Sequence, residues 1–284
     1  MSVEEAYFLF KKKFHSVENA SIYLAMQVVL GLDDRTSLIK SFKEEISEED
    51  KNEIEDILME VEEGKPLQYV LGHASFLGDE YYVSPAVLIP RPETEELVTI
   101  ALKDMAKLKR KMTIVDVGTG SGVIAISVKK KRINDEVIAI DNSESALEVA
   151  MHNANMHDVK INFYLGNLIN PLIEKNKKYD VVIANLPYIE KEEDVDPLVL
   201  LNEPRSAYLV KPGHKLYEQL FQMIKNSMGD EVRVYLEIHH DQKEVMQELC
   251  FTYFNRYSIE IRKDMSNHDR FVILHIWKEN NLKN

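Results

Sequence analysis

From residue 112 onward the chain alternates between short apolar runs and amphipathic segments of helix length, and this alternation limits the folds open to it. Strands are predicted at 112–117, 136–140, 160–165, 179–184, 231–238, 256–262 and 270–277. Helices are predicted between them at 121–131, 143–157, 214–227 and 241–250. Strands separated by helix-length connections form a parallel sheet that is covered on both faces. We therefore expect an α/β fold with a seven-stranded, Rossmann-like sheet.

The final strand is expected to run against the others. Only residues 263–269 join the last two predicted strands. A parallel crossover needs about a dozen residues or more. The last strand should therefore be antiparallel to its neighbours.

Before the alternating region, residues 1–64 show apolar side chains at helical spacing only. The last of these helices is marked most clearly, because Ser47 and Asp50 are placed like a capping box and Gly64 supplies a C-terminal stop. This pattern predicts a small helical domain at residues 1–72.

From Gln68 the pattern changes to extended runs at 69–71, 73–76 and 81–83, with turn chemistry at Leu77-Gly78-Asp79. We expect a β-hairpin linker at residues 73–89. An amphipathic helix at 94–108 then opens the α/β domain, which we place at residues 90–284.

Composition excludes several classes of protein. The formal charge of −13 gives no general attraction to polyphosphate. A single cysteine, Cys250, cannot form an internal disulfide, as is usual in a reducing compartment, and we expect it to be a packing residue. No run approaches the roughly 18 apolar residues of a membrane span, and the N-terminus lacks a signal-peptide core. We expect a soluble, cytoplasmic protein.

The segment Ile114-Val115-Asp116-Val117-Gly118-Thr119-Gly120-Ser121-Gly122 has the pattern of a buried strand, a tight glycine turn and a helix start. Such a turn lets the backbone approach a ligand and points free helix N–H groups at a negative group. A nicotinamide fingerprint has the spacing G-x-G-x-x-G, but Val123 breaks it here. The observed G-x-G-x-G suits S-adenosylmethionine, whose carboxylate can replace a phosphate. An ordinary glycine-rich turn is the alternative.

Three further residues follow predicted strands where a nucleoside would bind. Asp141 stands where an acidic residue usually accepts hydrogen bonds from two ribose hydroxyls, although it could instead cap the next helix. Asn167 could accept the adenine amino proton, or be a turn residue, and Leu168 could cover the ring.

The tetrapeptide Asn185-Leu186-Pro187-Tyr188 follows a predicted strand and suits a planar NH₂ group. The Asn185 side-chain oxygen accepts one N–H, the backbone carbonyl before Pro187 accepts the other, and the Tyr188 ring stacks on the flat group. Two acceptors would steer the nitrogen lone pair toward a methyl donor and stabilise the charge that develops on nitrogen. With the glycine loop, this pattern predicts N-methylation. A strand-ending turn with a packing tyrosine is the alternative.

Blocks that flank these motifs closely resemble the release factor glutamine methyltransferases, the PrmC/HemK family of protein N5-glutamine methyltransferases. The matching blocks are Pro66-Leu67-Gln68-Tyr69-Val70-Leu71-Gly72, Phe76-Leu77-Gly78, Val87-Leu88-Ile89-Pro90-Arg91-Pro92-Glu93-Thr94-Glu95, Asp141-Asn142-Ser143, Asn153-Ala154-Asn155, Glu203-Pro204, Leu236-Glu237-Ile238 and Lys263-Asp264. The resemblance covers residues 66 to about 272.

The resemblance implies a methyltransferase domain preceded by a helical substrate-recognition domain and a hairpin. It implies methylation of the glutamine amide nitrogen in the Gly-Gly-Gln motif of class-one release factors, which act in translation termination. S-adenosyl-L-methionine would be the donor and S-adenosyl-L-homocysteine the product. We expect a monomer that binds neither nucleic acid nor membrane.

The chain departs from the family pattern in the tetrapeptide, where the family usually has Asn-Pro-Pro-Tyr. Leu186 replaces the first proline, and Asn167 replaces a usual Asp. Because Leu186 still precedes Pro187, its backbone stays biased toward the extended region, but the fixed φ of proline is lost.

Other charged residues have less specific interpretations. Arg91, Glu93 and Glu95 either line the pocket or form a solvated helix start. The charged run at 190–194 follows the tetrapeptide and is a candidate for the rim of the substrate-binding site, here called the substrate lip. His239 and His240 lie too close together to form a metal site by themselves, and the sequence marks no third ligand. We therefore predict no metal site.

Two other functions remain open at this point. The tetrapeptide also occurs in ribosomal RNA and DNA adenine N6-methyltransferases, although the charge of −13 counts against a nucleic-acid substrate. A catalytically silent methyltransferase fold that serves as a binding module is the non-enzymatic alternative.

Overall fold

The structure is a computed structural model that describes residues 1–278. The chain divides into two compact units, the first comprising Met1–His73 and the second beginning at Ala74. The sequence places its boundaries at 72/73 and 89/90 instead. The last residues of the expected 90–284 domain lie outside the described part of the chain.

The first unit is a helical bundle. Its elements are α1 (Val3–Lys13), α2 (Asn19–Val29), α3 (Arg35–Lys40), the 3₁₀ helix η1 (Ser41–Lys43), α4 (Glu48–Glu62) and α5 (Leu67–Leu71). Ser47 caps α4 by accepting a hydrogen bond from the Asp50 N–H, as its sequence position predicts. The apolar faces of the helices meet in one core, whose fully buried members include Phe10, Ile22 and Ile54.

One predicted extended run is wrong. Residues 69–71 lie in the helix α5, which starts after Pro66 and ends at Gly72, a glycine in the left-handed region with φ +75°. Leu67 and Leu71 of α5 pack on the core of the first unit. Tertiary packing therefore overrides the strand preference of Tyr69 and Val70.

The hairpin of β1 (His73–Phe76) and β2 (Asp79–Tyr82) has the turn that the sequence predicts. Its side chains Phe76 and Tyr81 are fully buried in a core of the second unit. The Asn153 side chain also bonds both the N–H and the carbonyl of Tyr82. These contacts join the hairpin to the α/β unit.

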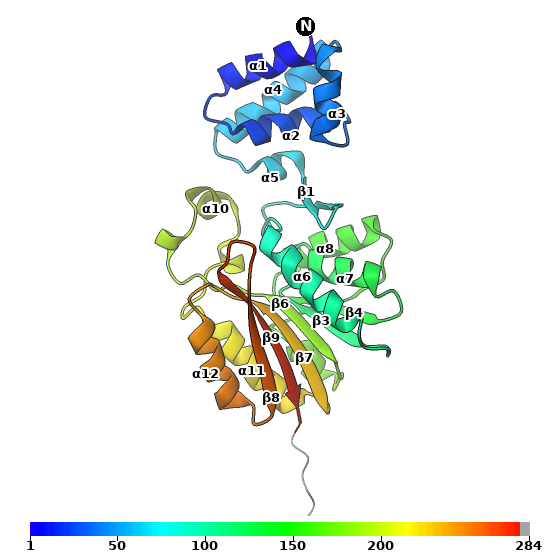
Figure 1. Ribbon diagram of the computed structural model, residues 1–284, viewed down its shortest axis with the longest axis vertical. Helices are drawn as coiled ribbons and strands as arrows, with labels where there is room; N and C mark the ends of the chain where they lie inside the picture. The colour runs from blue at the N-terminus through cyan, green and yellow to red at the C-terminus, as the bar shows by residue number, and fades with distance from the viewer. Residues whose placement is uncertain (279–284) are drawn as a thin grey trace, which may run out of the picture. The chain divides into compact units, whose positions relative to one another are not determined.

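The second unit contains a seven-stranded sheet (Figure 1). Its strands are β3 (Thr113–Val117), β4 (Glu136–Asp141), β5 (Asn162–Leu165), β6 (Val181–Asn185), β7 (Glu231–Glu237), β8 (Tyr257–Lys263) and β9 (Asp269–Trp277). They lie in the order β5-β4-β3-β6-β7-β9-β8. Strands β3 to β7 pair in parallel, whereas β9 runs antiparallel between β7 and β8, which confirms the predicted direction of the last strand.

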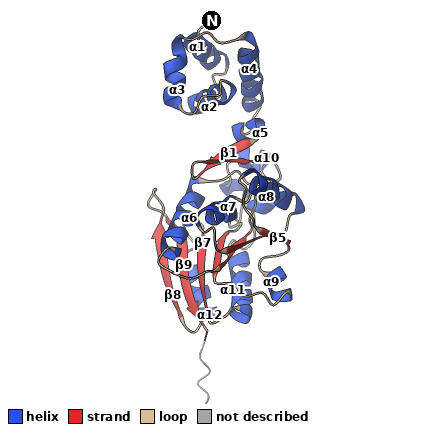
Figure 2. Ribbon diagram, turned by 90° about the vertical axis from the view of Figure 1, so that its right-hand side faces the viewer, coloured by secondary structure: helices blue, strands red, loops and turns tan. Residues whose placement is uncertain are grey.

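Helices cover both faces of the sheet, and Figure 2 shows its strands running between them. On one face α6 (Pro92–Met105), α7 (Val123–Lys131) and α8 (Glu144–Met156) pack against the sheet. On the other lie α9 (Asn170–Glu174), α11 (Lys215–Ser227) and α12 (Lys243–Tyr253). The short elements η2 (Glu192–Asp194), α10 (Pro197–Asn202) and η3 (Arg205–Ala207) lie between β6 and α11 along the chain.

The strand order reverses at β3. The chain proceeds outward from β3 to β4 and β5 and then returns to place β6 on the opposite side of β3. Ligands of open α/β sheets bind at such a switch point, outside the carboxyl ends of the strands. We therefore expect a ligand site at the segments that follow β3 and β6. Among residues 1–278, no helix has both the length and the apolar character that spanning a bilayer requires.

Candidate functional site

The glycine loop and the tetrapeptide meet at the switch point. Strands β3 and β6 pair along their length, and each motif begins where its strand ends. A Cβ atom added to Gly118 would lie 3.1 Å from Leu186 Cδ2 and 3.8 Å from the Asn185 carbonyl oxygen. The fold thus brings together two motifs that are far apart in the sequence.

The buried carboxylate of Asp116 holds the glycine loop in place. Asp116 Oδ2 accepts hydrogen bonds from the Thr119 hydroxyl at 2.6 Å and the Ala125 N–H at 3.1 Å. Burial raises the pKa of Asp116 to about 7, although these hydrogen bonds oppose the rise. The sequence did not single out Asp116, whose role is to fix the loop rather than to line a cavity.

Gly122 sits at the N-cap of α7 with φ +84°, and a Cβ there would lie 3.1 Å from Ala150 Cβ and 3.2 Å from Ala150 Cα. Gly120 also has a positive φ, +53°, but a Cβ there meets nothing within 4 Å. We expect Gly120→Ala to cost about 1 kcal/mol of unfolding free energy, since only left-handed strain is added. Gly122→Ala should cost about 2–4 kcal/mol, because crowding against α8 adds to that strain.

Urea unfolding of the two alanine variants, compared with the unchanged chain, measures this difference. The pair is matched in chemistry and backbone region, so that equal costs would contradict the packing argument.

A first cavity, here called the glycine-loop cavity, opens above these residues. Most of the predicted cofactor residues line it: Gly118, Thr119, Gly120, Ser121, Asp141, Asn167, Leu168 and Asn185. Gly122 is not among the lining residues, and its predicted contact with a cofactor stays a prediction. Leu168 has φ +50° and is buried at the end of the loop that follows β5.

Asp141 is oriented by two backbone groups. Its Oδ2 accepts the Gly120 N–H and its Oδ1 accepts the Ser143 N–H, both at 2.9 Å. The cap of α8 is Ser143, whose side chain accepts the Ala146 N–H. Each carboxylate oxygen can therefore accept a further hydrogen bond, Asp141 lines the cavity, and two such acceptors are what two vicinal hydroxyls require.

The segment at residues 86–91 also lines the glycine-loop cavity, and a buried glutamate holds it in place. Glu203 Oε1 accepts a hydrogen bond from Arg91 Nη2 at 2.6 Å, and its Oε2 accepts the Ile89 N–H at 3.0 Å. Arg91 itself lines the cavity, as the sequence suggested.

Removing this carboxylate should weaken the second unit. Glu203→Ala leaves the Arg91 guanidinium and the Ile89 N–H without their partner, and we expect a loss of about 3 kcal/mol in unfolding free energy. Glu203→Gln retains an acceptor for Ile89 and should lose about half as much. Chemical denaturation distinguishes the two, and an alanine variant as stable as the unchanged chain would show that the contacts contribute nothing.

A second cavity, here called the tyrosine cavity, adjoins the first. Its lining includes Tyr188, Tyr208, Glu237 and the segment 194–196. Asn185, Leu186 and Pro187 line both cavities, as do Leu88, Arg91 and Ala207, so that the two cavities meet at these residues. A group in one cavity can therefore meet a group in the other beside the tetrapeptide.

Asn185 is bonded on one side only. Its Nδ2 donates to Thr94 Oγ1 at 2.9 Å, and Thr94 Oγ1 donates to Glu237 Oε2 at 2.8 Å. Asn185 Oδ1 takes no hydrogen bond from the described residues. Tyr188 Oη lies 3.4 Å from Glu237 Oε1. Burial raises the Tyr188 pKa well above its ordinary value, and the charge of Glu237 adds to the rise, so that the phenol stays protonated.

The Leu186 carbonyl is the second predicted acceptor. The Tyr217 hydroxyl lies 3.3 Å from it and 2.6 Å from the Glu237 carbonyl oxygen. One hydroxyl carries one proton, and the shorter bond to Glu237 takes it. The Leu186 carbonyl therefore keeps a lone pair for another donor.

Sequence reasoning missed Thr94 and Glu237 as site residues. It named Glu93 and Glu95 of the same block, but neither lines the glycine-loop cavity or the tyrosine cavity, and Glu95 instead accepts the Leu77 N–H. The available signal was a carboxylate, Glu237, that directly follows the apolar residues Val234, Tyr235 and Leu236 at the end of β7, beside β6. In the predicted lip, Asp194 lines the tyrosine cavity, whereas Glu190 accepts the Gly213 N–H.

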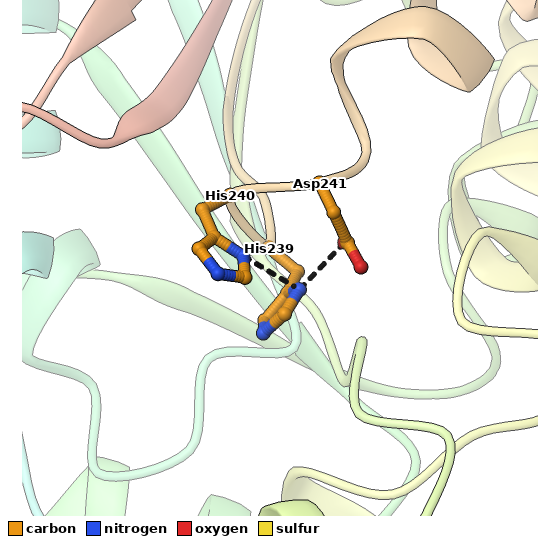
Figure 3. A group of neighbouring side chains, drawn as sticks. All are labelled: His239, His240 and Asp241. Carbon is orange, nitrogen blue, oxygen red and sulfur yellow. Dashed lines mark hydrogen bonds and ion pairs between the residues drawn. The ribbon is translucent and has the colours of Figure 1, made fainter.

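The histidine pair at 239–240 lies beside the tyrosine cavity but does not line it. Figure 3 shows that Asp241 joins the pair, which supplies the third group that the sequence did not mark. His239 Nδ1 lies 2.6 Å from Asp241 Oδ1 and 3.1 Å from His240 Nδ1. Hydrogen bonds account for this arrangement, and the absence of a metal stays a prediction.

Comparison with known proteins places both units in described families. The model of the PrmC N-terminal domain matches residues 4–72, and that of the methyltransferase small domain matches residues 97–213. The chain is 39% identical over 243 residues to the release factor glutamine methyltransferase of Enterococcus faecalis, covering 84% of this chain and 86% of that one. It is 34% identical over 285 residues to the Bacillus subtilis protein of the same name, with coverage of 94% and 99%.

Solved structures show the same fold at low identity. A methyltransferase from Pyrococcus furiosus superposes with a TM-score of 0.53 at 17% identity, over 71% of this chain and 90% of that one. A 16S rRNA N2 G1207 methyltransferase from T. thermophilus, in complex with AdoMet and guanosine, gives a TM-score of 0.53 at 13% identity, over 73% and 50%. The predicted Rossmann-like methyltransferase fold is thereby confirmed.

Proposed function

The chain belongs to the release factor glutamine methyltransferases, and on this premise we propose that it methylates the side-chain amide nitrogen of a glutamine in release factors. The relatives that carry this name align with most of the chain. We assign the target to the glutamine of the Gly-Gly-Gln motif in class-one release factors. The observation that carries the proposal is that Asn185, Leu186 and Pro187 lie where the two cavities meet. Asn185 Oδ1 and the Leu186 carbonyl oxygen can each accept a hydrogen bond from a substrate there.

The glycine-loop cavity fits S-adenosylmethionine. Gly118 borders the cavity with backbone alone, and a Cβ there would crowd Leu186 Cδ2 at 3.1 Å. Asp141 would receive the ribose hydroxyls, and Asn167 and Leu168 would meet the adenine. The cofactor, when bound, supplies an electrophilic methyl group on a sulfonium.

The tyrosine cavity would receive the glutamine side chain. Asn185 Oδ1 and the Leu186 carbonyl would each accept one N–H of the amide, so that the nitrogen lone pair is directed toward the glycine-loop cavity. These acceptors stabilise positive charge that develops on nitrogen as its resonance with the carbonyl is lost. Tyr188, a neutral phenol, would cover the amide plane.

This arrangement needs no base before transfer. After methylation the amide nitrogen is strongly acidic, and its proton can pass to water. With Leu186 in place of the usual proline, the backbone carbonyl of residue 186 would still accept the amide N–H, because Pro187 keeps residue 186 in the extended region.

The remaining expectations are part of the same proposal. The first unit would recognise the release factor, and exposed apolar side chains such as Phe8 and Ile39 offer a surface for it. The chain would act as a cytoplasmic monomer without binding nucleic acid, in keeping with a net charge of −13.

Transfer of a labelled methyl group tests the proposal. The full chain is incubated with tritiated S-adenosylmethionine and either a purified class-one release factor or ribosomal RNA. Label in the release factor is the expected result. Label only in RNA would favour the adenine N6-methyltransferase alternative, and label in neither would favour a silent fold.

A further inference from the structure

We propose that Glu237 and Thr94 are positioning residues that fix which face of the Asn185 amide meets the substrate. The three side chains come from the end of β7, the first turn of α6 and the end of β6. They form one chain of hydrogen bonds, from Asn185 Nδ2 to Thr94 Oγ1 and from Thr94 Oγ1 to Glu237 Oε2. The inference rests on the proposed function, since it concerns the atom that receives the substrate amide.

The direction of this chain follows from counting protons. An ionised carboxylate can only accept, so Thr94 must donate its single hydroxyl proton to Glu237. Thr94 Oγ1 can then only accept from Asn185, which it does from Nδ2. The amide is thereby fixed with Nδ2 toward α6 and Oδ1 left for a donor.

The alternative rotamer would block binding. If the amide turned over, Nδ2 would face the substrate NH₂, and two donor groups would oppose each other. Asparagine alone does not choose between the two orientations, because its oxygen and nitrogen have nearly the same shape. The choice comes from Glu237 through Thr94.

Glu237 also reaches the other end of the tetrapeptide. Its Oε1 lies 3.4 Å from the Tyr188 hydroxyl, and its backbone carbonyl accepts the proton of Tyr217. Thr94 and Glu237 are 4% and 2% exposed, so that water does not compete for these bonds. One buried carboxylate therefore orients both Asn185 and Tyr188.

Opposing effects act on the pKa of the Glu237 carboxyl group. Burial raises its pKa to about 7, and the nearby Glu93 of α6 acts in the same direction. The hydrogen bonds from Thr94 and Tyr188 and the positive charge of Arg270 on β9 lower it. On α11, the neutral hydroxyl of Tyr217 faces the backbone carbonyl of Glu237.

Protonation would release the constraint on the amide. A neutral Glu237 can donate to Thr94 Oγ1, and Thr94 is then free to donate to Asn185 Oδ1, which reverses the amide. Turnover at saturating donor should therefore fall as the pH drops through about 7, with Glu237 protonated on the acid side.

A matched pair of variants tests the relay. Thr94→Val keeps the shape of the side chain and removes the hydroxyl, and Thr94→Ser keeps the hydroxyl. We expect Thr94→Val to lower kcat roughly 10-fold to 10²-fold, with Thr94→Ser restoring most of the loss. Thr252→Val, an exposed substitution on α12, controls for the exchange itself and should leave kcat unchanged.

The pH profile of kcat separates positioning from simple structural support. The acid limb near pH 7 should be present in the unchanged chain and in Thr94→Ser, and absent from Thr94→Val. Titration of Asp116, whose pKa is also raised to about 7, would instead change donor affinity, because Asp116 holds the glycine loop. Donor affinity is therefore measured by calorimetry at each pH.

Two outcomes would overturn the relay. One is a Thr94→Val variant with unchanged kcat and the same acid limb. The other is equal loss in the valine and serine variants, which would make the effect one of packing. Activity of the unchanged chain on a release factor, measured in the same assay, keeps a failure of the relay distinct from a failure of the proposed function.

Discussion

Asn185→Ala should lower kcat by roughly 10²-fold or more, because it removes a preorganised acceptor at the atom where charge develops. Among residues 1–278, Asn185 Oδ1 accepts no hydrogen bond, whereas Nδ2 is held by Thr94, so Oδ1 is the acceptor that the substitution removes. Affinity for S-adenosylmethionine should change far less, since the glycine loop and Asp141 remain. Single-turnover kinetics on a release factor, together with calorimetry for the donor, measure both quantities.

Asn185→Asp provides a sharper control. It keeps an oxygen acceptor but loses the N–H that Thr94 receives, and it places a second carboxylate near Glu237. We expect it to be nearly as impaired as the alanine variant. If Asn185→Ala turned over at close to the normal rate, the amide clamp would be refuted.

Asp141→Ala should weaken S-adenosylmethionine binding by about 10²-fold, which corresponds to about 3 kcal/mol. The estimate follows from losing two hydrogen bonds between ribose hydroxyls and a charged acceptor. Kd is measured by calorimetry, and kcat at saturating donor should be less affected than Kd.

Asp141 also holds the N–H groups of Gly120 and Ser143, so a structural effect has to be separated from a lost contact. Asp141→Asn keeps one oxygen acceptor and should have an intermediate Kd. Unfolding midpoints of both variants report damage to the loop. An alanine variant that binds the donor normally would remove Asp141 from the ribose site.

The fold could largely be predicted from the sequence, because the strands of a buried parallel sheet are continuous apolar runs. Each of the seven predicted strands overlaps an observed one, and the short connection at 263–269 indicated the antiparallel end correctly. The exceptions were short elements. Helix α5 was mistaken for an extended run, and α3, α9 and α10 were missed, because five or six residues are too few for a helical period to be recognised.

The candidate site was predictable where neighbours in the sequence carry it. The glycine loop, Asp141 and the tetrapeptide each follow a strand, and strand ends converge at the switch point. Contacts across the fold could not be found in this way. Thr94 and Glu237 are separated by 143 residues, and only the pairing of β6 with β7 and the packing of α6 bring them together.

Peptide mass spectrometry of a release factor after incubation with the full chain and S-adenosylmethionine tests the central claim most directly. The account predicts a mass gain of one methylene on the glutamine amide of the Gly-Gly-Gln segment, and no gain with the Asn185→Ala variant over the same time. A gain on another residue, or an equal gain with Asn185→Ala, would contradict it.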